Sequence, residues 1–139
     1  MNAEAKLNRT WWALRLGLGT MAFAAGADKF FDLLVNWNKY LAPQARRSVP
    51  MRSQNFMKLV GAIEMLVGLG ILTRNTRLSS YAASGWLAAI AGQLIVSGDY
   101  FDIAVRDVEL AIAAFALGQL TEIREQNQLA GRRELRRVA

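Results

Sequence analysis

The stretch "LSSYAASGWLAAIAGQLIVSG", Leu78–Gly98, decides the fold expected for this chain, because it runs for 21 residues without a charged side chain. A helix rises about 1.5 Å per residue, so about 20 residues cross the hydrocarbon core of a membrane. The length of this stretch and its lack of charge therefore predict a membrane-spanning helix over residues 79–97.

Three further apolar stretches have the length of a membrane span. Residues 11–27 are interrupted only by Arg15, which lies close enough to one end for its side chain to reach the interface. Residues 56–72 carry Glu64 in the middle, and residues 103–121 are charged in their first two turns and apolar afterwards. The sequence therefore predicts an all-α fold, an integral membrane four-helix bundle.

The segments between and after the spans complete one membrane domain over residues 1–139. Apolar side chains recur at helical spacing in residues 28–41, which predicts an additional amphipathic helix between spans one and two, lying in the interface or extending the first span. The turn "RNTR", Arg74–Arg77, makes spans two and three antiparallel neighbours. Residues 122–139 are interpreted as a basic cytoplasmic tail that binds anionic lipid head groups or a partner protein.

The net charge of +6 comes from cations that cluster at the two ends of the chain and in one loop. They do not alternate with stacking aromatic side chains, so no nucleic-acid partner is predicted. The termini and the Arg74–Arg77 turn together hold nine Lys or Arg residues, and the opposite side holds five. The positive-inside rule then predicts a multi-pass protein of the bacterial inner membrane with both termini in the cytoplasm.

The sequence contains no cysteine and no histidine, which excludes several kinds of chemistry. Disulfides, thiol redox pairs, covalent c-type haem and histidine-ligated metals are all excluded, and no metal site is predicted. Nucleophile pairs that need histidine are excluded as well, and no catalytic residue is assigned. Any redox role would need a bound organic carrier, such as a quinone, or a partner subunit.

Six ionisable side chains are expected in one layer near the outer ends of the spans. An isolated charge in a membrane costs at least about 3 kcal/mol, so these groups are expected to face the bundle interior and to pair. Arg106 lies one helical turn from Glu109 and is one candidate to neutralise it. The candidates for a ligand site or for buried ion pairs are Asp28, Lys29, Glu64, Arg106, Asp107 and Glu109.

Three pieces of the sequence resemble the DoxX family of small four-helix bacterial membrane proteins. They are "AGADKF" at the end of span one, "GAIEMLVGLGIL" on span two and "DYFDIAVRDVELAIAAFALG" leading into span four. The similarity extends from about Arg15 to Gly118. The basic tail and the loop from Asn38 to Gln54 lie outside it.

The resemblance implies a four-span bundle in a superfamily that includes membrane subunits of thiosulfate:quinone oxidoreductases and proteins associated with redox enzymes. It also implies that Lys29, Glu64, Arg106 and Asp107 occupy the recurring polar positions of the family. Because this chain lacks cysteine, relatives that use thiols give no guide to its mechanism.

Three functions are weighed from these features. The first is an accessory or anchor subunit of a quinone-linked oxidoreductase, not catalytic alone, with a quinone head group in the outer half of the bundle. The second is a purely structural subunit that packs against other membrane helices. A small transporter or proton path is ranked last, because the inner halves of spans one and three contain no carboxyl. A soluble helical protein and a signal peptide at the N-terminus are the competing interpretations of the apolar stretches.

Overall fold

The computed structural model describes residues 2–34, 36–37, 52–98 and 100–138. Within these residues the chain is all-helical, with four α-helices and no strand. The predicted all-α, four-helix class is therefore confirmed, and each predicted span lies inside one helix. The helices are α1 (Ala3–Phe31), α3 (Ser53–Leu72), α4 (Thr76–Ser97) and α5 (Phe101–Val138).

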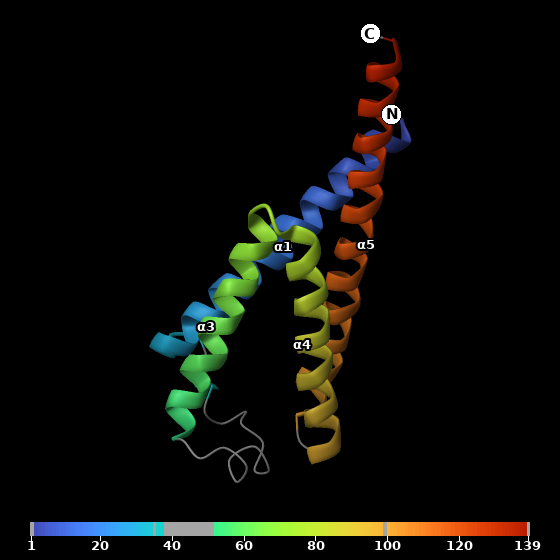
Figure 1. Ribbon diagram of the computed structural model, residues 1–139. Coiled ribbons are helices and arrows are strands. Elements are labelled where there is room, and N and C mark those ends of the chain that lie inside the picture. The colour runs from blue at the N-terminus through green and yellow to red at the C-terminus, as the bar shows by residue number, and fades with distance from the viewer. Residues whose placement is uncertain (1, 35, 38–51, 99, 139) are drawn as a thin grey trace.

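The four helices form two antiparallel pairs, α1 with α3 and α4 with α5 (Figure 1). The pairs meet at the end that holds the α3–α4 turn, residues 73–75, and diverge toward the other end. We call the meeting end the apex. Its buried apolar residues are Trp11, Ile71, Ala83, Ala114 and Leu117.

Glycine allows α1 and α3 to pack backbone against backbone. A Cβ atom on Gly26 would lie 2.5 Å from the carbonyl oxygen of Gly61, and a Cβ on Gly61 would lie equally close to the carbonyl oxygen of Gly26. No larger residue fits at either position unless the helices move apart. Such close approach through small residues is typical of helices that associate in membranes.

The α4–α5 pair is built on two stripes of mostly small side chains. Their spacing of mainly three and four residues places each stripe on one face of its helix. Along α5 the buried residues are Ala104, Asp107, Ala111, Ala114, Leu117, Gly118 and Thr121. Along α4 they are Thr76, Ser80, Ala83, Ala91 and Leu94.

Two side chains of α1 tie the apex together. Arg15 donates hydrogen bonds to the carbonyl oxygens of residues 71, 72 and 73 at distances of 2.9, 2.7 and 2.6 Å. These carbonyls end α3 and have no partner within the helix, so Arg15 caps it from outside. Trp11 donates its indole N–H to the Thr121 hydroxyl at 2.8 Å, which joins α1 to α5.

Of the helix predicted over residues 28–41, the structure shows only residues 28–31, as the end of α1 and not as an additional helix. The α1 helix continues to Phe31 and ends there, because Asp32 adopts a left-handed backbone conformation with φ of 49°. The next two residues form a bend instead of a helical turn. Residues 38–41 lie outside the described residues.

The Asp28 side chain explains why the helix stops. One of its carboxylate oxygens accepts the backbone N–H groups of Leu33 and Leu34, at 3.0 and 2.9 Å. Those two N–H groups would bond to carbonyls of the preceding turn if the helix continued. The short acidic side chain competes for them and turns the chain away from the α1 axis.

Length and composition single out one helix that could cross a membrane within the described residues. It is α3, over Gln54–Leu72, with a mean hydropathy of 1.6. This reverses the order expected from charge alone, in which residues 79–97 are the clearest span. That segment carries no charge, but its serine, glycine, tyrosine and glutamine residues lower its hydropathy.

The last part of α5 extends well past the apex as an exposed helix (Figure 1). Residues 122–138, most of the predicted basic tail, continue the helical axis without a break. Both termini lie at the apex end of the molecule. The helical tail therefore projects from the same end as the α3–α4 turn.

Replacing Arg15 by methionine is expected to destabilise the fold, since three hydrogen bonds to the end of α3 are lost and the carbonyl of Leu72 loses the donor that Arg15 supplies. We expect the free energy of unfolding to fall by about 2 kcal/mol, measured by denaturation followed by circular dichroism. Arg9→Met, at an exposed position on the same helix, is the matched control and should leave stability close to wild type. Equal effects of the two substitutions would contradict this role of Arg15.

Alanine at two helical glycines should act in opposite directions. Gly26→Ala is expected to unfold or strongly destabilise the protein, because its Cβ would overlap the backbone of α3. Gly85→Ala, where nothing lies within 4 Å of the new Cβ, should stabilise α4 by up to about 1 kcal/mol. Thermal denaturation of both variants tests the pair, and a tolerated Gly26→Ala would show that the α1–α3 contact is not tight.

Candidate functional site

A buried ion pair joins α1 to α3 away from the apex. The Lys29 Nζ lies 2.6 Å from a carboxylate oxygen of Glu64, and the two side chains are 5% and 17% exposed. Lys29 belongs to the last turn of α1, and Glu64 lies in the middle of α3. The close glycine contact next to them lets a lysine on one helix reach a carboxylate on the other.

The turn after α1 folds an aromatic ring onto this pair. The Lys29 Nζ lies 3.7 Å from the ring centre of Trp37, close enough for a cation–π interaction. The Trp37 indole N–H donates to the second carboxylate oxygen of Asp28 at 2.7 Å. Asp28 therefore both ends α1 and positions the ring that covers Lys29.

A second pair of charges lies near the start of α5. The Arg106 guanidinium donates to the Asp107 carboxylate at 3.0 Å through Nη2 and at 3.2 Å through Nε. The two side chains differ in burial, with Arg106 54% exposed and Asp107 only 5% exposed. Asp107 belongs to the buried stripe of α5, whereas the Arg106 side chain is half exposed.

The two pairs of charges belong to different pairs of helices. Among the described residues no hydrogen bond or salt bridge joins Lys29 or Glu64 to Arg106 or Asp107, so the two pairs act on each other only through longer-range electrostatics. We call Lys29, Glu64, Arg106 and Asp107 the four-charge cluster, which is neutral as a whole when all four groups are ionised. The structure thus pairs four of the six candidates two by two, and Asp28 precedes Lys29 directly in α1.

Glu109 is the exception among the six candidates. It was expected to face the bundle interior, but it lies on an exposed face of α5, so that expectation is wrong. Residues two apart on a helix point about 200° apart, so the inward position of Asp107 turns Glu109 outward. Arg106 pairs with Asp107 and not with Glu109.

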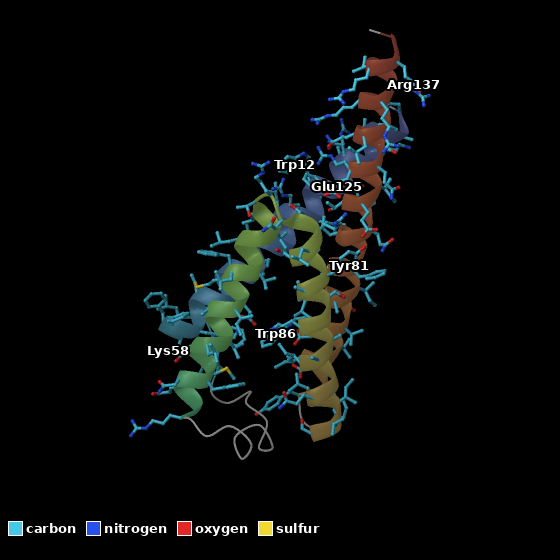
Figure 2. The ribbon with its side chains drawn as sticks, viewed as in Figure 1. Trp12, Lys58, Tyr81, Trp86, Glu125 and Arg137 are labelled. Atoms are coloured by element: carbon cyan, nitrogen blue, oxygen red, sulfur yellow. The ribbon has the colours of Figure 1, made fainter. Side chains whose placement is uncertain are left out.

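Sequence reasoning missed Trp37 and Trp86 as parts of the interior. Nothing in the sequence indicates that the turn after α1 folds Trp37 onto Lys29. Trp86 projects from α4 toward the α1–α3 pair (Figure 2), and its buried indole Nε1 has no hydrogen-bond partner among the described residues. A tryptophan inside an otherwise small-residue helix was the available signal for an inward-facing donor.

The chemistry available to the cluster is that of donors and carboxylates. Lys29 and Arg106 supply N–H donors, and Glu64 and Asp107 can accept protons or hydrogen bonds. Within the described residues no three acidic side chains gather in a way that could hold a metal ion. The arrangement suits a polar organic group with oxygen acceptors better than it suits a cation.

Comparisons with known proteins add nothing to this geometry: no protein-family model, no curated protein and no solved structure matches the chain.

Removing the charge of one partner of the Lys29–Glu64 pair should lower the free energy of unfolding more than removing both charges. Lys29→Met leaves a buried carboxylate without its cation, and we expect a loss of about 3 to 5 kcal/mol in unfolding free energy. Adding Glu64→Gln to that variant should recover much of the loss, because the unpaired charge is gone. A double-mutant cycle by chemical denaturation measures the coupling, and strictly additive effects would exclude it.

Proposed function

We propose that this chain is a small integral membrane subunit of a bacterial inner-membrane complex, with its helices in contact with lipid. Large apolar side chains are exposed along all four helices, which supports a lipid-facing exterior. Examples with at least half of their surface exposed are Leu16, Met21, Leu59, Leu66, Leu78, Val96, Val105, Ile112 and Phe115.

The buried Lys29–Glu64 ion pair carries this proposal. A polar interior with an apolar exterior is the arrangement that membrane helices need, since charges must face the bundle and pair. Asp107 is a further buried carboxylate, on the facing pair of helices. In this proposal the predicted spans 11–27, 56–72, 79–97 and 103–121 cross the bilayer.

The Lys and Arg residues near the two termini and in the α3–α4 turn determine the orientation that we propose. The apex, the two termini and the α3–α4 turn would lie on the cytoplasmic side, as the positive-inside rule predicts. The four-charge cluster, which lies away from the apex, would then belong to the outer half of the bilayer. It would face the lipid layer in which membrane-soluble carriers diffuse.

For the ligand of the cluster we propose a quinone head group. Its carbonyl oxygens need N–H donors in a buried setting, and the unmatched indole N–H of Trp86 fits that need. Lys29 and Arg106 would be the other donors, with Glu64 and Asp107 available to hold protons. When bound, a quinone would supply the electron-carrying chemistry that the side chains of this chain do not have.

The chain would then act as an accessory subunit and would not be catalytic alone. Without cysteine or histidine it has no ligand set for the usual protein-bound redox centres, so electrons would have to come from a partner enzyme. The resemblance to the DoxX family suggests the same class of partner, a quinone-linked oxidoreductase.

A purely structural subunit is the second candidate, and one groove favours it. The groove runs along α4 and α5, has a volume of about 430 Å³ and includes Ser84, Ala88 and Gly92 on α4. Nothing lies within 4 Å of the position that a Cβ on Gly92 would take. Small residues with open space above them are what a neighbouring membrane helix packs against.

Purification in mild detergent, followed by solvent extraction, tests the quinone proposal. We expect about one quinone per chain in the wild type and a loss of most of it in Glu64→Gln, since the cluster then keeps an uncompensated Lys29. Glu109→Gln is the matched control, because it makes the same chemical change at an exposed position on α5. Its quinone content should equal that of the wild type.

The outcomes separate the two candidates. Quinone lost in Glu64→Gln and kept in Glu109→Gln supports the redox subunit. Partner proteins at a fixed ratio in the same preparation, without quinone, would support the structural subunit and leave the cluster as an assembly contact. A chain that remains in buffer after detergent phase separation would overturn the membrane proposal itself.

A further inference from the structure

The distal part of the α5 tail carries a concentrated positive charge. Every side chain from residue 125 to residue 137 is exposed, and the one acidic residue after Glu125 is Glu134. Arg137 lies far beyond the rest of the fold in Figure 2. The four arginines of this part, which we call the distal arginines, are Arg132, Arg133, Arg136 and Arg137.

The distal arginines share one face of the helix. Successive residues of a helix turn by about 100°, so positions i, i+1, i+4 and i+5 fall within an arc of about 140°. Glu134 lies outside that arc. The face therefore presents four guanidinium groups with no acidic side chain among them, each able to bind a carboxylate through two parallel hydrogen bonds.

The distal arginines lie too far from the apex to act on it. At about 1.5 Å per residue, Arg132 is about 16 Å and Arg137 about 24 Å beyond Thr121 along the helical axis. Electrostatic interactions are screened over about 8 Å at physiological ionic strength. If α5 leaves the bilayer near Thr121, as in the proposed function, the continuous helix carries these arginines past the head groups and into the aqueous phase.

We propose that the distal arginines bind an acidic surface of a soluble protein on the cytoplasmic side. This rests on the proposed membrane orientation, which places the helix upright in water. An acidic surface supplies the carboxylates that the arginine face lacks. A second copy of the same face would bring like charges together, and the absence of aromatic side chains between the arginines disfavours single-stranded nucleic acid.

The test uses the full chain in nanodiscs of phosphatidylcholine, with fluorescein-labelled polyglutamate as the acidic probe. Anisotropy gives the affinity at low and at physiological salt. We expect Arg133→Gln with Arg137→Gln to weaken binding by about five- to tenfold, as for the loss of two exposed ion pairs. Arg52→Gln with Lys58→Gln removes the same charge from exposed residues at the far end of α3 and should change the affinity less than twofold.

Two further arms identify the occupant. Replacing part of the lipid by phosphatidylglycerol should leave polyglutamate binding unchanged, whereas a strong loss would show that the tail lies on anionic lipid and would overturn the proposal. Tighter binding of duplex DNA than of polyglutamate at equal charge would also overturn it. So would equal affinities of the tail and control variants.

Failure of the membrane proposal has a different signature. A chain that does not enter nanodiscs contradicts the proposed function, and the same anisotropy assay then runs in buffer without lipid. Loss of binding in the tail variant under that condition would still support the acidic partner.

Discussion

The contact of Arg15 with the end of α3 is the constraint on which the rest of the structure depends. One guanidinium group, on a neighbouring helix, donates to three carbonyls that the helix end leaves without partners in the helix. The Thr76 hydroxyl donates to two of the same carbonyls. Because the α3–α4 turn follows at once, fixing the end of α3 against α1 also fixes where α4 begins. With Trp11 bonded to Thr121, all four helices are tied at one end.

That single junction determines where the charged residues meet. The helix pairs diverge from the apex (Figure 1), so residues far from it are brought together only where glycine lets the backbones approach. Gly26 and Gly61 provide this approach beside Lys29 and Glu64. The ion pair is therefore a product of close packing, and the packing would be costly if either charge lacked its partner.

The sequence predicted the helices and the α3–α4 turn well and the turn after α1 poorly. Long apolar stretches indicate helices reliably because this local signal does not depend on how the helices pack together. The end of α1 was missed because a side-chain competitor, Asp28, overrides an amphipathic pattern that would otherwise continue. The outward position of Glu109 could have been predicted from the spacing of Ala104, Ala111 and Ala114, since those small residues already define the buried face of α5. The position of Trp37 over Lys29 depends on the turn and has no periodic signal.

The glycines of the chain fall into two groups, those in contact with another helix and those with open space above them. At Gly19, Gly26, Gly61, Gly68 and Gly118 an added Cβ would collide with another helix, so these residues serve contacts within the chain. At the helical positions Gly17, Gly85, Gly92 and Gly131 nothing lies within 4 Å of an added Cβ, although glycine inside a helix costs up to about 1 kcal/mol relative to alanine. At these open positions no contact within the chain offsets the lower helix propensity of glycine. In the structural-subunit proposal, Gly85 and Gly92 would be the α4 positions against which a further helix packs, next to the apolar side chains of the groove.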